Sequence, residues 1–272
     1  MTAIDNLRSA YGFTKMPFGR DIAPQALNQH RAHQEAVARI AWCVAEQAIG
    51  VVTGECGSGK TVAARAALSA LDASRHTVIY LGTPGVGLRG TYATIVSSLG
   101  GVPRFHCSSL IPQAADLLAQ EAEERGKKVT LCLDEVQLLD AETLEGLRCL
   151  QNAGMDAQHP FGCILLAQPM FRRRLRLGAF TALDQRVGLR YVVGGLEATE
   201  CGPYVAHHLK LCGRADTLFS DDAIALIYQV ARGLPRAVNN LATQALVAAY
   251  ASGKAIVDES AARAAVAEVT AE

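Results

Sequence analysis

The chain has 272 residues, enough to bury a large core in one or two domains. Its 26 basic and 26 acidic side chains cancel, which excludes a polycation, so any nucleic-acid binding must come from a local patch. A composition of 50% hydrophobic and 19% charged residues is typical of a globular protein with many buried helices.

The eight cysteines show no CxxC pair and no metal-binding spacing, which favours free thiols in a reducing cytosol. Cys132 and Cys163 stand inside apolar strand patterns, where we expect buried thiols. The N-terminus lacks a signal-peptide pattern, and no apolar run approaches the ~20 residues of a membrane span. We therefore expect a soluble, cytoplasmic protein with no membrane partner.

Residues 1–30 are predicted to form an N-terminal arm. Its aromatic residues, around Phe13 and Phe18, fit a base pocket and a hydrophobic seam equally well. A helix is expected over 29–49, with apolar positions at Val37, Ile40 and Val44.

Short apolar strands then alternate with helical patterns as far as residue 195. The strands are expected at 49–53, 76–81, 129–133, 162–167 and 189–193, and the helices at 62–71, 91–99, 111–125, 141–152 and 171–177. The stretches 82–90 and 100–104 are expected to be glycine-rich loops. Such alternation predicts an α/β domain over 31–195, with a parallel sheet covered on both faces.

The pattern changes after residue 195. Helices without intervening strands are expected at 197–211, 220–231, 235–251 and 258–269, and Ser220 supplies a good N-cap. Residues 196–272 are therefore predicted to form a separate all-helical domain.

A P-loop stands between the first strand and its following helix. The pattern is Gly54-x-x-x-x-Gly59-Lys60-Thr61. Its glycines let backbone N–H groups surround phosphate oxygens, and the helix N-terminus adds its positive end. We expect ATP to be bound by Gly54, Glu55, Cys56, Gly57, Ser58, Gly59, Lys60, Thr61 and Val62. The alternative is a tight turn without a ligand.

Asp134 and Glu135 follow a predicted buried strand and complement the P-loop. Asp134 is expected to bind the nucleotide-associated Mg²⁺ together with the Thr61 hydroxyl. Glu135 is placed to deprotonate an attacking water, which favours hydrolysis over passive binding. The alternative for the pair is a helix cap.

Two further polar residues are candidates for catalysis. Gln168 ends the next strand, where its amide is expected to sense the γ-phosphate or position water, or else is simply a polar strand end. Arg186 lies far from the P-loop in sequence, and in an oligomer such an arginine can stabilise charge at the neighbouring subunit's γ-phosphate. A solvated or DNA-facing arginine is the alternative.

Gly233-Leu234-Pro235-Arg236 opens a helix of the helical domain. Pro235 suits the first helical turn, whereas a cation is unfavourable at a free helix N-terminus. Arg236 therefore suggests a phosphate partner, with a surface salt bridge as the alternative.

Together these features resemble an AAA+ ATPase, a three-layer α/β P-loop sandwich followed by a small all-helical lid. Four stretches narrow the resemblance: Phe13 with Pro17-Phe18, Leu133-Asp134-Glu135-Val136-Gln137, Ala167-Gln168-Pro169 and Gly233-Leu234-Pro235-Arg236. With these stretches the chain resembles the ExeA-type ATPases, and it is similar in layout to transposition regulators of the MuB, IstB and TnsC type.

The resemblance implies ATP hydrolysis with Mg²⁺, with Gln168 as sensor 1, Arg186 as arginine finger and Arg236 as sensor 2. One departure is the basic run over 172–176, where Arg172 or Arg174 competes with Arg186 for the role of trans-acting group.

For the biological role, we expect a transposition helper that assembles on duplex DNA as an ATP-bound ring or filament and recruits a transposase. Secretion ATPases of this type are expected to carry a transmembrane segment and a peptidoglycan-binding region, and neither is found in this sequence. A secretion-pathway or other protein-assembly ATPase remains the alternative. Contacts to DNA phosphates are expected from the loops after the second strand and the next helix, at Arg89, Thr91 and Arg104, with ordinary solvated arginines as the alternative.

Overall fold

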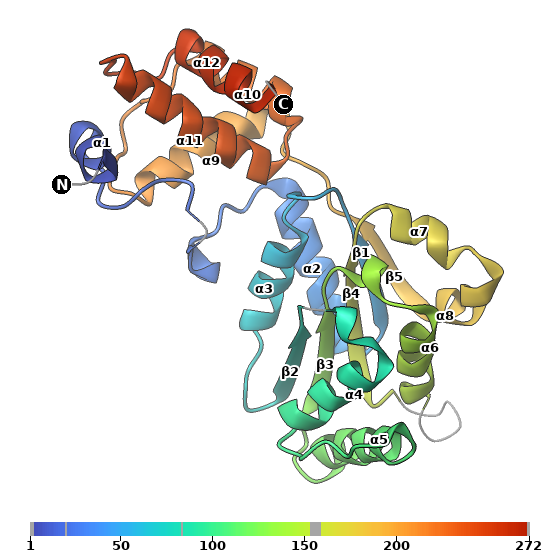
Figure 1. Cartoon of the computed structure of the whole chain (residues 1–272). Coiled ribbons are helices and arrows are strands. Elements are labelled where there is room, and N and C mark those ends of the chain that lie inside the picture. The colour runs from blue at the N-terminus through green and yellow to red at the C-terminus, as the bar shows by residue number, and fades with distance from the viewer. Residues whose placement is uncertain (1–2, 20, 83, 153–158, 271–272) are drawn as a thin grey trace. The chain divides into compact units, whose positions relative to one another are not determined.

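The computed structural model describes residues 3–19, 21–82, 84–152 and 159–270 (Figure 1). Contacts divide the chain into an α/β unit, Glu35–Cys56 with Lys60–Val193, and a helical unit, Met1–Gln34 with Gly57–Gly59 and Gly194–Glu272. The predicted arm and helical domain include residues 1–2, 20 and 271–272, and the predicted loop 82–90 includes Thr83; these lie outside the described residues.

The α/β unit is built on a five-stranded parallel sheet, as the sequence predicted. Its strands run in the order β2-β3-β4-β1-β5. Their bounds are β1 (Ile49–Thr53), β2 (His76–Leu81), β3 (Lys128–Leu133), β4 (Phe161–Ala167) and β5 (Val187–Val192). Every residue of β1 and β4 is buried, whereas β2, at the edge of the sheet, exposes Val78 and Tyr80. Continuous apolar runs in the central strands follow from coverage on both faces.

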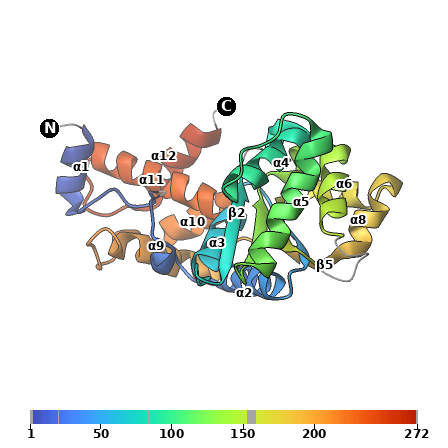
Figure 2. The same ribbon diagram turned by 90° about the horizontal axis from the view of Figure 1, so that it is seen from below.

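Helices cover both faces of this sheet and make three layers (Figures 1 and 2). Alternate strand residues enter opposite cores, so that Val51 belongs to one and Val52 to the other. The core around Val52 is closed by α2 (Arg31–Ala45) and α3 (Lys60–Ser69). The core around Val51 is closed by α4 (Gly87–Ser98), α5 (Cys107–Glu123), α6 (Ala141–Leu150), α7 (Met170–Leu175) and α8 (Thr181–Arg186).

Helix α4 begins earlier than predicted. Residues 82–90 were expected to be a loop because of their glycines, but a 3₁₀ turn at Pro84–Val86 leads directly into α4 at Gly87. A Cβ at Gly90 would lie 2.4 Å from Cβ of Val86, so this glycine lets the turn pack against the helix. Packing therefore outweighs the low helix propensity of glycine here.

The cysteine predictions for the sheet are confirmed. Cys132 and Cys163 are 0% and 3% exposed. Burial raises the pKa of the Cys132 thiol to about 12, so it is neutral at physiological pH. Both act as small apolar core residues.

The helical unit contains α1 (Ala3–Tyr11), α9 (Ala198–Lys210), α10 (Asp221–Ala231), α11 (Pro235–Ala251) and α12 (Glu259–Thr270). A short 3₁₀ turn lies at Pro24–Ala26. The Ser220 side chain accepts a hydrogen bond from the N–H of Ala223 and caps α10, as predicted, and Pro235 occupies the first turn of α11. The predicted domain boundary at 195 lies close to the observed division at Gly194.

The aromatic residues of the N-terminal segment belong to the core of the helical unit. Tyr11, Phe13 and Phe18 are 5%, 6% and 8% exposed. The ring of Phe18 stacks on His208 at 5.3 Å and meets Phe219 edge-on at 6.2 Å. Of the two predictions left open for these side chains, the hydrophobic seam describes this structure. Among the described residues, no helix has both the length and the apolar character needed to cross a bilayer.

Candidate functional site

The P-loop joins β1 to α3 at the carboxyl edge of the sheet. Gly57 and Gly59 have φ angles of 83° and 96°, a region that favours glycine over other residues. The N–H of Gly54 donates to the carbonyl oxygen of Ala167 at 3.2 Å, so the loop starts firmly against β4. The predicted strand, glycine-rich turn and helix are therefore all present.

The P-loop side chains show two features that fit a phosphate ligand. Lys60 is 6% exposed, and its Nζ donates to the carbonyl oxygens of Gly54 at 2.9 Å and Glu55 at 3.0 Å. The hydroxyl of Ser58 is buried with no hydrogen-bond partner. A buried donor of this kind is costly unless a ligand satisfies it. The predicted Cys56 and Val62 are exposed at the same loop and helix start.

Asp134 contacts the P-loop helix directly through Thr61, the residue expected to share the magnesium site with it. The Thr61 hydroxyl donates to Oδ2 of Asp134 at 2.6 Å, and the N–H of Glu135 donates to Oδ1 at 2.8 Å. These oxygens are hard donors of the type that Mg²⁺ prefers, and Mg²⁺ commonly uses one or two carboxylates together with substrate phosphates. Within the described ranges no group of three His, Cys, Asp or Glu side chains is placed to hold a metal ion.

Glu135 is held by two glutamine side chains. Its backbone has a φ of 51°, an uncommon conformation for a residue with a side chain. Oε2 of Glu135 accepts hydrogen bonds from Nε2 of Gln137 at 2.5 Å and from Nε2 of Gln168 at 3.4 Å. In turn, Oε1 of Gln137 accepts the backbone N–H of Gln168 at 3.1 Å. The structure therefore brings Glu135 and Gln168 together, as expected for residues at one sheet edge.

Two residues of this site were missed by the sequence reading. Gln137 lies two positions after Glu135, a spacing that gave it no assigned role. Tyr80 lies on β2, and its hydroxyl donates to Oδ2 of Asp134 at 3.1 Å. Only the neighbouring positions of β2 and β3 in the sheet bring Tyr80 to this carboxylate.

The structure separates the arginines proposed as trans-acting groups. The guanidinium of Arg174 donates to the carbonyl oxygens of Gln137 at 3.2 Å and Leu139 at 2.6 Å, and it lies over the ring of Phe180 at 4.9 Å. The Arg174 side chain is thus held by contacts within its own α/β unit. Arg172 is exposed on the same helix.

Arg186 is the last residue of α8 and donates to Oδ1 of Asn152 at 3.3 Å. The next residue, Val187, pairs with Ile49, the first residue of β1, whereas the P-loop follows Thr53 at the other end of that strand. Arg186 therefore lies at the sheet edge opposite to the P-loop of its own chain.

The three predicted DNA contacts have different environments. Arg89 lies on α4 rather than on a loop, and its Nε donates to the carbonyl oxygen of Phe105 at 2.9 Å. Arg104 lies in the loop before α5. Thr91 is 1% exposed and its hydroxyl donates to the carbonyl oxygen of Gly87, so its side chain is not presented to a ligand here.

Arg236 is the second residue of α11, after Pro235. Its backbone N–H donates to the carbonyl oxygen of Gly57 at 3.3 Å, and both residues are grouped in the helical unit. A Cβ at Gly57 would lie 2.7 Å from Cβ of Arg236. Glycine at 57 is therefore required by both backbone conformation and space.

Comparison with known proteins supports the AAA+ fold. Residues 44–175 match the model of the AAA domain family. The chain is 27% identical over 247 residues to general secretion pathway protein A of Aeromonas hydrophila, which agrees with the predicted ExeA-type resemblance. That match covers 89% of this chain but 45% of the relative.

Solved structures of other proteins share this fold. The Aeropyrum pernix ORC2 protein, in its ADPNP–ADP complexes, has a TM-score of 0.71 and 18% identity over 93% of this chain and 71% of its own. Drosophila ORC bound to DNA has a TM-score of 0.68 and 18% identity, covering 100% of this chain and 67% of its own. At these identities the likeness establishes the α/β P-loop AAA+ fold. The resemblance to transposition regulators stays a prediction.

Proposed function

We propose that this chain binds ATP with Mg²⁺ and hydrolyses it to ADP and phosphate. The supporting observation is that the P-loop, Asp134, Glu135 and Gln168 lie together at one edge of the sheet. The Thr61 hydroxyl oxygen lies 2.6 Å from Oδ2 of Asp134. These groups follow the ends of three neighbouring strands, β1, β3 and β4, and such strand ends are where ligands bind in parallel α/β sheets.

In the proposed reaction the P-loop N–H groups and Lys60 bind the phosphates, and Lys60 leaves the carbonyl oxygens of Gly54 and Glu55 to do so. Thr61 and Asp134 would hold Mg²⁺, which supplies positive charge at the β- and γ-phosphate oxygens. Glu135 accepts a proton from water as the water oxygen bonds to the γ-phosphorus and the bond to ADP breaks. Gln168 orients that water.

We further propose that the active form is a homo-oligomer, a ring or a filament. Arg186 lies at the sheet edge opposite to its own P-loop, which suits a group that acts on the neighbouring subunit's nucleotide. Arg236, at the start of α11 and hydrogen-bonded through its N–H to Gly57 of the P-loop, is proposed to contact the bound nucleotide.

Phosphate release from Mg-ATP by the purified full chain tests the enzymatic proposal. Lys60→Ala removes the principal charged phosphate ligand and serves as the inactive reference. Phosphate release no faster than that of Lys60→Ala, under conditions where the wild-type chain assembles, would contradict the proposal.

We propose duplex DNA as the client of the assembled ATPase. The stretch 82–115 contains no Asp or Glu but carries Arg89 and Arg104. The loop before α5 is braced, since Gln113 accepts the N–H of Arg104 at 3.0 Å and donates to the carbonyl oxygen of Val102 at 2.9 Å. That loop exposes 75% of Phe105, over whose ring Arg89 lies at 5.2 Å.

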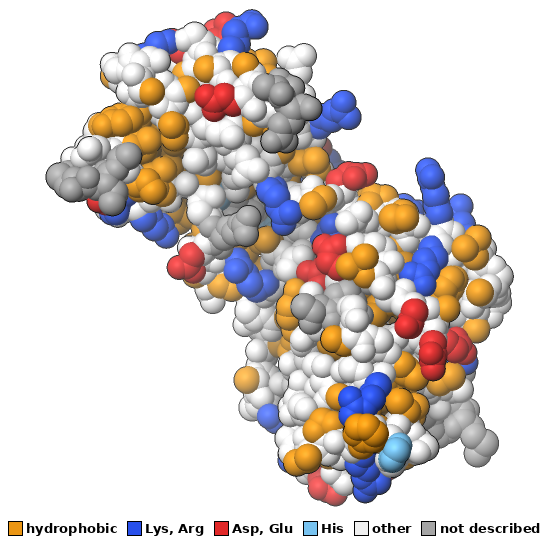
Figure 3. Space-filling model, in the orientation of Figure 1, with side chains coloured by type: hydrophobic (Ala, Val, Ile, Leu, Met, Phe, Trp, Pro, Cys, Tyr) orange, Lys and Arg blue, Asp and Glu red, His pale blue; other side chains and the backbone are white. Residues whose placement is uncertain are grey.

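Basic and aromatic side chains together fit nucleic acid, because arginines neutralise phosphates and an exposed ring can stack on a base. Figure 3 shows basic, hydrophobic and histidine side chains gathered at the end of the α/β unit where α4 and α5 lie. Drosophila ORC, which shares the fold, is bound to DNA in its solved structure. Recruitment of a transposase to that DNA is the finer proposal and rests on the sequence resemblance.

A second candidate is supported by the similarity to general secretion pathway protein A. In that function the ATPase would act on a protein assembly rather than on DNA. The same loop before α5 would then contact protein, and binding to random duplex DNA would be absent.

Arg104→Ala is expected to weaken ATP-dependent binding to random duplex DNA and to reduce the salt dependence. Removing one phosphate contact lowers the slope of log affinity against log salt by about 1. Fluorescence anisotropy with a labelled duplex, measured with a non-hydrolysable ATP analogue across a salt series, gives both quantities.

Arg75→Ala is the matched control, because Arg75 is an exposed arginine of the same unit in the loop before β2. The control should leave affinity and slope unchanged. If the wild-type chain shows no salt-sensitive DNA binding with ATP, the DNA client is excluded and the protein-assembly function is favoured.

A further inference from the structure

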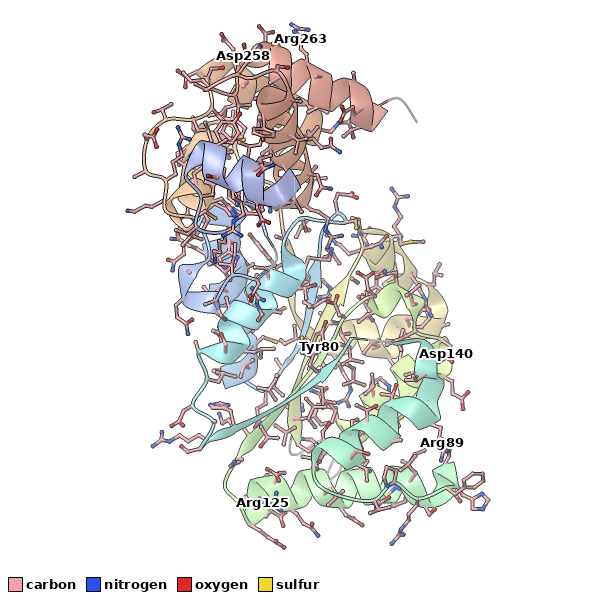
Figure 4. The ribbon with its side chains drawn as sticks, turned by 60° about the vertical axis from the view of Figure 1, so that its left-hand side comes forward. Tyr80, Arg89, Arg125, Asp140, Asp258 and Arg263 are labelled. Atoms are coloured by element: carbon pink, nitrogen blue, oxygen red, sulfur yellow. The ribbon has the colours of Figure 1, made fainter. Side chains whose placement is uncertain are left out.

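We infer that Tyr80 is a positioning residue for the metal site, because its hydroxyl holds the Asp134 carboxylate in the orientation that receives a divalent cation. The inference rests on the proposed binding of Mg-ATP. Tyr80 is labelled in Figure 4, on the edge strand β2.

The sheet topology explains how a residue of β2 reaches this site. Strands β2 and β3 are parallel neighbours, and Tyr80 pairs in register with Cys132. Asp134 follows two residues later and therefore projects to the same face as Cys132. Diagonal neighbours of this kind lie within reach of a long aromatic side chain, and the hydroxyl of Tyr80 lies 3.1 Å from Oδ2 of Asp134.

The Asp134 carboxylate accepts hydrogen bonds from three donors, and the Tyr80 hydroxyl is one of these donors. Oδ1 accepts the N–H of Glu135, while Oδ2 accepts the hydroxyls of both Thr61 and Tyr80. Thr61 is expected to ligate the metal itself, so its hydroxyl would no longer serve Asp134 alone once the metal is bound. Tyr80 and the N–H of Glu135 are then the two fixed donors that orient the carboxylate. Asp134 is 5% exposed, so solvent has little access to replace a lost donor.

The ring of Tyr80 occupies a space that is kept open for it. A Cβ at Gly82 would lie 2.8 Å from Cε1 of the ring, closer than side chains pack. Tyr80 as a whole residue is 52% exposed, although its hydroxyl is directed to the carboxylate. Burial of apolar surface therefore does not explain why a tyrosine stands at position 80, whereas its hydrogen bond to Asp134 does.

Hydrogen bonds from groups that do not themselves bind the metal fix the orientation of a metal-binding carboxylate. Losing one typically lowers metal affinity or activity about 10- to 100-fold. The ligand class is a divalent cation that arrives with a nucleotide, because Thr61 and Asp134 supply only part of an octahedral shell.

Tyr80→Phe tests the inference with a fluorescent ADP analogue titrated into the full chain. Without metal, with EDTA present, the variant should bind the analogue within about twofold of the wild type, since the phosphate-binding loop is intact. In a Mg²⁺ series, the metal concentration that gives half of the full tightening should rise about tenfold. Gly82→Ala, which displaces the ring but keeps the hydroxyl, should shift the same concentration in the same direction.

Tyr92→Phe is the matched control. The Tyr92 hydroxyl donates to the carbonyl oxygen of Gly146 at 2.8 Å, in the same unit but outside the proposed site. A loss of stability alone would affect both tyrosine variants, whereas a change in Mg²⁺ dependence should be confined to Tyr80→Phe.

Three results would overturn the inference. If the wild-type chain tightens its nucleotide binding with Mg²⁺ and Tyr80→Phe does so at the same metal concentration, the positioning role alone fails. If Tyr80→Phe weakens binding equally with and without metal, the residue supports the nucleotide or the fold instead. If the wild-type chain binds no nucleotide at all, the proposed function fails and this inference fails with it.

Discussion

Glu135→Gln is expected to abolish ATP hydrolysis while leaving ATP bound. Removing a general base slows the chemical step by about 10²- to 10⁴-fold, because the attacking water no longer has a group to take its proton. The replacement keeps the shape of the side chain and one oxygen that can still accept from the amides of Gln137 and Gln168. The phosphate-binding groups, Lys60 and Thr61, are untouched.

Two measurements on the same preparation separate these effects. Single-turnover phosphate release reports the chemical step, and titration with a fluorescent ATP analogue reports affinity. Glu142→Gln, on the first turn of α6, is the control and should hydrolyse ATP at the wild-type rate. Hydrolysis by Glu135→Gln at the wild-type rate would remove Glu135 from the role of base.

Arg186→Ala is expected to lower hydrolysis by about 10³-fold or more, the range typical of a group that stabilises transition-state charge on a transferring phosphate. The effect should be confined to the assembled protein, since Arg186 lies opposite to its own P-loop along β1. Arg186 lines a hollow of about 580 Å³ together with Ile49 and Gly188, at the end of β1 that lies away from the P-loop. Steady-state ATPase rates measured across a series of protein concentrations check this.

Mixing two inactive variants identifies action in trans. Lys60→Ala keeps Arg186, and Arg186→Ala keeps the P-loop. In an equal mixture that assembles at random, about a quarter of the sites would combine both intact groups and recover activity. No recovery, in mixtures shown to co-assemble, would place Arg186 in a structural role. Arg172→Ala tests the other candidate for the trans-acting arginine. Arg172 is exposed, whereas Arg174 donates to carbonyl oxygens of its own unit.

Local motifs made much of this site predictable. The P-loop and the Asp134–Glu135 pair each occupy a few consecutive residues, and their chemistry depends on backbone turns that the sequence itself specifies. Gln168 was predictable because parallel strands end at a common edge. Tyr80 and Gln137 were not, since Tyr80 reaches Asp134 only through the order of the strands, and Gln137 reaches Glu135 only through the turn at φ 51°.

The remaining differences reflect packing between distant segments. Glycines at 82–90 predicted a loop, but contacts of α4 with its neighbours favour a helix from Gly87. The aromatic residues Phe13 and Phe18 gave no indication of the partner they cover, because their contacts lie about 200 residues further along the chain, at His208 and Phe219 among others. Thr91 was expected at the start of a helix next to that loop, and it is instead buried inside α4, which begins four residues earlier at Gly87.

Strand β4 lies between the strand that leads into the P-loop and the strand that ends at Asp134 and Glu135. Gln168, the residue directly after β4, is hydrogen-bonded through its backbone to Gln137 and through its side chain to Glu135. In the proposed cycle Gln168 orients the attacking water, so one side chain would contact both that water and the base that deprotonates it. The short segment after β4 would therefore set the distance between the water and Glu135.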